Sequence, residues 1–108
     1  MHRRSLLERS LALGLLAPAL PAHSQAQKTA FIVSGFPAGG MGDHVARPLA
    51  EKLRGVYAQN VVVDSKVGAG GRIAVDYVKR AAPDGSTILQ IPSSPMTLYP
   101  HTYRKLGY

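Results

Sequence analysis

The chain has 108 residues, of which 45% are hydrophobic, so it can form one small globular domain at most. It contains no cysteine, which excludes a disulfide framework, a cysteine-ligated metal site and a thiol nucleophile. Thirteen Lys and Arg against six Asp and Glu give a formal net charge of +7, but the basic residues do not alternate with aromatic ones. The charge therefore predicts a solvated basic surface and no nucleic-acid binding.

The start of the chain is predicted to be a cleavable signal peptide over residues 1–26. Arg3 and Arg4 supply a basic beginning, and residues 6–20, mostly Leu, Ala and Gly, are followed by small side chains. The uninterrupted apolar part, residues 11–20, is shorter than the ~20 residues that a membrane-spanning helix needs. The paired arginines also resemble a twin-arginine signal, so the Sec and twin-arginine export routes both stay open.

Strand and helix patterns alternate after this segment. Residues 30–36 are apolar and β-branched, which predicts a buried strand that ends before a proline. Apolar residues at helical spacing between Ala46 and Leu53 predict a helix. Pro48 lies inside this pattern, so the helix either begins near Asp43, with Pro48 close to its first turn, or is kinked at Pro48.

The second half of the chain continues the alternation. Three valines at residues 61–63, with no polar residue between them, predict a strand that is buried on both faces. A helical apolar period runs from Ala74 to Ala81, residues 86–91 predict a third strand, and residues 92–95 predict a loop. The order β-α-β-α-β predicts an α/β fold with a parallel sheet and right-handed βαβ crossovers.

Glycine-rich turns follow the first two predicted strands, at residues 36–43 and 67–71. In a parallel sheet such turns lie at the carboxyl ends of the strands, where glycines leave backbone N–H groups open and the next helix dipole favours an anion. Ser93 and Ser94 follow the third strand at the same edge. We therefore predict anion recognition at this edge. The candidate ligand-binding residues are Pro37, Ala38, Gly39, Gly40, Gly42, Asp43, Gly68, Ala69, Gly70, Gly71, Ser93 and Ser94.

Each candidate also has a purely structural interpretation. The glycines can serve only to permit tight turns, and the two serines can belong to a plain turn. The carboxylate of Asp43 is expected to cap the helix start, and it would repel an anionic solute. His44 has no second histidine at metal-binding spacing, so no metal site is expected.

The alternative from another functional class is a nucleotide- or dinucleotide-binding α/β enzyme that uses the turn at residues 68–71. This turn follows a strand and opens a helix as a dinucleotide fingerprint does, but Ile73 stands where the third glycine belongs. No Asp or Glu ends the next predicted strand, and no serine lies in a Gly-x-Ser-x-Gly elbow. The dinucleotide fingerprint is therefore incomplete in this sequence.

Four spaced motifs carry a resemblance to a known family. They are the turn at residues 36–43, the valines at 61–63, the turn at 68–71, and Ala-Ala-Pro-Asp-Gly-Ser-Thr at 81–87. In this order they resemble the tripartite tricarboxylate transporter receptors, the Bug or TctC-like extracytoplasmic solute receptors, over nearly all of residues 28–108. The chain departs from the family pattern at residues 65–67, where Ser-Lys-Val replaces Asn-Arg-Pro.

The resemblance implies a type II periplasmic binding protein fold, in which two α/β lobes close on a small carboxylate held largely by backbone amides and water. It also implies a periplasmic receptor, monomeric when complete, without catalysis or cofactor, that delivers its solute to the membrane permease subunits of a tripartite tricarboxylate transporter. Members of the family are much longer. Residues 27–108 are therefore expected to form an incomplete N-terminal part of the first lobe, a fragment that need not function alone.

Overall fold

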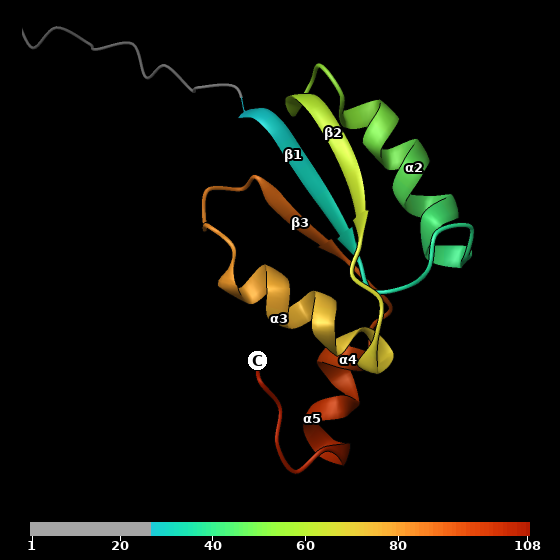
Figure 1. The fold of residues 1–108 in the computed structure, drawn as a ribbon, viewed down its shortest axis with the longest axis vertical. Coiled ribbons are helices and arrows are strands. Elements are labelled where there is room, and N and C mark those ends of the chain that lie inside the picture. Colours follow the sequence, from blue (N-terminus) through green and yellow to red (C-terminus); the bar gives the residue numbers. More distant parts are fainter. Residues whose placement is uncertain (1–26) are drawn as a thin grey trace, which may run out of the picture.

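The computed structural model describes residues 27–108, and the predicted signal peptide lies outside the described residues (Figure 1). Strands and helices alternate along the described chain and end in two short helices. Their bounds are β1 (Gln27–Ser34), α2 (Met41–Leu53), β2 (Ala58–Ser65), the 3-10 helix η1 (Ala69–Gly71), α3 (Arg72–Arg80), β3 (Thr87–Gln90), α4 (Ser94–Thr97) and α5 (Tyr99–Thr102). Within this part of the chain, no helix is both long and apolar enough to cross a membrane.

The strands form one parallel sheet in the order β2-β1-β3. Helix α2 contacts β1 and β2, whereas α3 contacts β1 and β3. Because side chains alternate along a strand, Ile32 faces α2 and its neighbour Val33 points to the opposite face, which α3 covers. This arrangement confirms the predicted α/β class with a parallel sheet.

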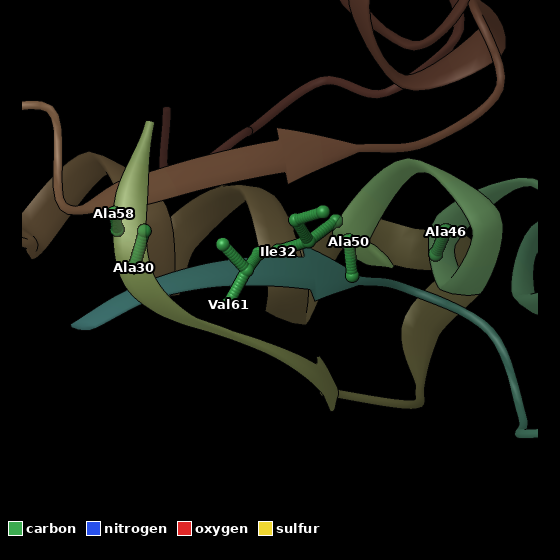
Figure 2. Packing of buried hydrophobic residues seen from close by; sticks show 6 residues of the cluster. All are labelled: Ala30, Ile32, Ala46, Ala50, Ala58 and Val61. Atoms are coloured by element: carbon green, nitrogen blue, oxygen red, sulfur yellow. The ribbon is translucent and has the colours of Figure 1, made fainter. Parts of the chain in front are cut away.

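The core under α2 is built mainly from small side chains. Ile32 is fully buried between the sheet and the helix, and Leu53 and Val63 pack against the edge of this cluster. Alanines on the inner face of α2 let the helix lie close to the sheet (Figure 2). The buried cluster consists of Ala30, Ile32, Ala46, Ala50, Ala58 and Val61.

The expectation that the valines of β2 are buried on both faces is wrong. Val61 is 3% exposed, but the next residue, Val62, is 44% exposed. The reason is that β2 lies at the edge of the sheet, and only the face toward α2 is covered there. Val62 lies in register with Phe31, which is 40% exposed. The sheet face that points away from α2 is therefore open at these two residues.

Two boundaries also differ from the sequence-based expectation. Helix α2 begins at Met41, so Pro48 lies in its interior and not near its first turn. The segment at residues 92–95 is not simply a loop, because α4 begins at Ser94. Pro95 occupies the first turn of α4, where a missing N–H costs no intrahelical hydrogen bond.

Asp43 does not cap α2 as expected, although it does stabilise the helix start. The N-cap is Gly40, and no side chain caps the helix there. Asp43 lies in the first turn and is 7% exposed, and its Oδ2 accepts hydrogen bonds from the Gly39 N–H at 2.9 Å and from Arg47 Nε at 2.6 Å. The hydrogen bond from Arg47, and to a smaller extent the one from Gly39, holds the pKa of the Asp43 carboxyl below its usual value.

We expect Asp43→Asn to lower stability near neutral pH and to remove part of the acid sensitivity of the fold. Because the folded pKa is lowered, the carboxylate stabilises the fold above an unfolded pKa of about 4. That contribution is lost as the pH falls through the lowered folded value. The urea midpoints of the variant and the unmodified chain should differ near neutral pH and converge in acid.

The matched control for this prediction is Asp76→Asn. It removes an i,i+4 pair with Arg80, which also spans 2.6 Å but lies at a more exposed position on α3. Exposed pairs contribute little to stability, so this variant should change the urea midpoint less. Equal midpoints for Asp43→Asn and the unmodified chain near neutral pH would contradict the prediction.

Candidate functional site

The loops that follow the three strands meet at Gly71. A Cβ placed on Gly35, directly after β1, would lie only 2.9 Å from the Gly71 Cα. A Cβ on Gly71 would lie 3.6 Å from both the ring of Phe36 and the ring of Pro95, which follow β1 and β3. The two predicted glycine turns and the segment after β3 are therefore brought together at the carboxyl edge of the sheet.

The first glycine turn uses part of its own hydrogen-bonding capacity. The Gly39 N–H donates to Asp43, and the Gly40 N–H donates to the Pro37 carbonyl at 3.2 Å. Among residues 27–108, the N–H groups of Met41 and Gly42 have no acceptor. Both belong to the first turn of α2, whose orphan donors and dipole favour a negatively charged ligand. The Ala38 N–H also lacks an acceptor within the described chain.

Sequence reasoning named Gly42 as a candidate but missed Met41. The Met41 side chain, which is 84% exposed, suggests no binding chemistry. Its relevant group is the backbone N–H. The position at the first residue of a helix, directly after a glycine, is the sequence signal that could have identified it.

Polar side chains lie under the first turn of α2. A Cβ on Gly42 would lie 3.3 Å from Ser34 Oγ and 3.4 Å from Gln90 Oε1. Ser34 and Gln90 are paired in register at the ends of β1 and β3, and Ser34 is 2% exposed. Within the described chain, Gln90 Oε1 and Asp43 Oδ1 are buried without a hydrogen-bond donor. The strand-end positions of Ser34 and Gln90 could have indicated this patch from the sequence.

The second glycine turn has an unusual backbone. The φ angles of Gly68, Ala69, Gly70 and Gly71 are +137°, +50°, +66° and +90°, so even the alanine adopts the left-handed region. The Gly71 N–H donates to the Gly68 carbonyl at 3.0 Å. The N–H groups of Ala69 and Gly70 find no acceptor in residues 27–108. This turn therefore presents a second pair of open backbone donors.

The two candidate serines lie at the start of α4. Ser93 occupies the N-cap position, but its hydroxyl makes no capping hydrogen bond. The Ser93 carbonyl accepts the N–H groups of Met96 and Thr97. Pro95, two residues further on, packs against Gly71. The structure thus places the serines at the start of α4, directly before the proline that lies beside Gly71.

The described residues offer no metal centre. No group of three or more His, Cys, Asp or Glu side chains in residues 27–108 is arranged to hold a metal ion. His44 is exposed on α2. Beside the open backbone N–H groups at this edge, Asp43 and Arg47 form an ion pair.

Comparisons with known proteins identify the family. Residues 45–108 match the family described as tripartite tricarboxylate transporter family receptor. The chain is 36% identical over 112 residues to a UPF0065 protein in the gbd 5′ region of Cupriavidus necator, covering 94% of this chain and 33% of that relative. It is 33% identical over 106 residues to a UPF0065 protein of Bordetella pertussis, covering 96% and 33% of the two chains.

Protein BugT of Bordetella pertussis is 41% identical over 81 residues, covering 75% of this chain and 24% of BugT. The chain spans about a third of the length of the UPF0065 relatives. The family is one of transporter receptors and not of enzymes. Since the family match covers more than half of the sequence, this chain belongs to the tripartite tricarboxylate transporter receptor family.

Proposed function

We propose that this chain is part of the first lobe of a solute receptor and binds a small carboxylate at its two glycine turns. The observation that carries the proposal is the pair of open donor sets at one sheet edge. One set is the N–H groups of Met41 and Gly42, and the other is those of Ala69 and Gly70. The first set lies at the start of α2, where a carboxylate is favoured by the dipole and by charge-assisted hydrogen bonds. The second set lies in η1, directly before α3.

The charge of Asp43 does not oppose this proposal. Its Oδ2 accepts hydrogen bonds from Arg47 and from the Gly39 N–H, so its charge is balanced within the turn. The Arg47 side chain is 62% exposed, and its ion pair with Asp43 carries no net charge. We therefore assign Asp43 to holding the first turn in shape, while Met41 and Gly42 face the carboxylate.

Family membership supports the remainder of the proposal. The chain is exported to the periplasm by a cleavable signal peptide, and the second lobe supplies the other wall of the site. Binding of the solute shifts the two lobes toward the closed form, which docks on the membrane permease subunits of a tripartite transporter. The complete receptor acts as a monomer and catalyses no reaction.

The direct test is an NMR titration of the ¹⁵N-labelled chain with succinate, citrate and glutamate, with NAD as the ligand of the alternative class. A few charge-assisted hydrogen bonds at a one-sided site should give a dissociation constant of about a millimolar, or ~4 kcal/mol. The amide signals of Met41, Gly42, Ala69 and Gly70 should shift together. No shifts with any carboxylate, or shifts with NAD alone, would contradict the proposal.

Met41→Pro should weaken carboxylate binding by about tenfold or more, because it deletes one charge-assisted donor worth ~1.5 to 3 kcal/mol. The substitution suits the backbone. Proline is favoured at the first residue of a helix, and Gly40 before it is extended, with φ −81° and ψ 179°. The fold should therefore keep its urea midpoint, and the dissociation constant from the same titration is the readout.

Met41→Ala is the matched control, since it removes the exposed side chain but keeps the N–H. It should bind carboxylate as the unmodified chain does. Equal dissociation constants for Met41→Pro and Met41→Ala would show that this N–H does not contact the solute.

A further inference from the structure

The second glycine turn is held from outside by residues that follow β3. The Tyr99 hydroxyl donates to the Gly70 carbonyl at 3.0 Å, across 29 positions of sequence. A Cβ on Gly70 would lie 2.5 Å from this hydroxyl oxygen, so only glycine lets the tyrosine approach so closely. Figure 1 shows α4 and α5 beside the start of α3, which is where this contact forms.

A second contact holds the adjacent carbonyl. Arg72 Nε donates to the Ala69 carbonyl at 2.9 Å, and the Arg72 guanidinium lies 4.3 Å from the centre of the Tyr103 ring. The Tyr103 ring in turn packs edge-on against Tyr99, with 5.0 Å between their centres. Tyr99, Tyr103 and Arg72 therefore form one connected clamp, which we call the tyrosine clamp.

The clamp helps to fix the orientation of two peptide units in the turn. No peptide bond in the described chain is cis, and in a trans peptide the C=O and N–H point in opposite directions. The Ala69 carbonyl accepts both the backbone N–H and the Nε of Arg72, so the Gly70 N–H in the same peptide unit is directed away from Arg72. Since Tyr99 holds the Gly70 carbonyl, the Gly71 N–H is directed toward its acceptor, the Gly68 carbonyl.

The backbone of the turn is strained and flexible, and the clamp restricts its conformations. Ala69 has a φ of +50°, which is unfavourable for a residue with a side chain, and two glycines follow it. A free turn of this composition would populate several conformations. Ordering it on binding would cost conformational entropy, whereas a turn that is already held avoids that cost.

Resting on the proposed carboxylate site, we propose that Tyr99 is a positioning residue. By holding the Gly70 carbonyl it keeps the Gly71 N–H on the Gly68 carbonyl, and so keeps the second glycine turn closed with its Ala69 and Gly70 N–H groups open to the solute. Arg72 and Tyr103 help to hold the turn in this conformation, through the Ala69 carbonyl and the contact between the guanidinium and the ring. Tyr99 acts through the Gly70 carbonyl and does not contact the solute.

The test compares Tyr99→Phe with Tyr57→Phe in the full chain. Both remove only a hydroxyl that donates to a glycine carbonyl, but Tyr57 contacts Gly85, in the turn before β3. The first readout needs no solute: it is the ¹³C shift of the Gly70 carbonyl with the ¹H and ¹⁵N shifts of the Gly70 and Gly71 amides. The second is the dissociation constant for succinate.

Tyr99→Phe should change the Gly70 and Gly71 signals and weaken succinate binding about two- to tenfold, the range for one neutral hydrogen bond. Tyr57→Phe should leave both readouts unchanged while altering the urea midpoint to a similar degree. A common loss of stability therefore cannot mimic the expected result.

The outcomes separate this inference from the proposed function. If the unmodified chain binds succinate and Tyr99→Phe binds it equally well, the inference is overturned and the proposed function stands. If the unmodified chain gives no carboxylate-induced shifts at any tested concentration, the proposed function fails and the inference fails with it. Unchanged Gly70 and Gly71 signals in Tyr99→Phe would also overturn the inference.

Discussion

The close approach of Gly35 to Gly71 is the constraint on which the candidate site depends. With a Cβ on Gly35 only 2.9 Å from the Gly71 Cα, a side chain at position 35 would push the loop after β1 away from the turn after β2. Phe36 and Pro95 then pack around the same glycine. The sheet order β2-β1-β3 makes this possible, because the central strand brings its loop between the other two.

Once these loops meet, hydrogen bonding decides which backbone groups are open to a ligand. The first turn satisfies the N–H groups of Gly39 and Gly40 internally, with the help of Asp43, and leaves those at the start of α2 open. In the second turn, Tyr99 and Arg72 hold the carbonyl groups of Gly70 and Ala69. In both turns, side chains hold the backbone in shape, and the recognition chemistry that we propose belongs to the backbone N–H groups.

The alternation of strands and helices could be predicted because local signals determine it. These signals are the spacing of apolar residues within each element and the glycines and prolines between elements. The edge position of β2 could not, since the exposure of Val62 depends on strand order. The short helices after β3 also escaped prediction. They are held by distant contacts, such as those of Tyr99 with Gly70 and of Tyr108 with the Pro95 carbonyl, which no local pattern indicates. The turns were located correctly, but their internal hydrogen bonds depend on backbone angles that glycine leaves undetermined.

The most direct test of this account is a nuclear Overhauser measurement between the α protons of Gly35 and Gly71 in the labelled full chain. These residues are 36 positions apart in the printed sequence, so contact between them arises only if the loops after β1 and β2 meet. The account predicts a strong cross-peak, because a Cβ placed on Gly35 would lie only 2.9 Å from the Gly71 Cα. One α proton of Gly35 points in the direction of that Cβ. A spectrum in which both glycines are assigned and no cross-peak joins them would contradict it.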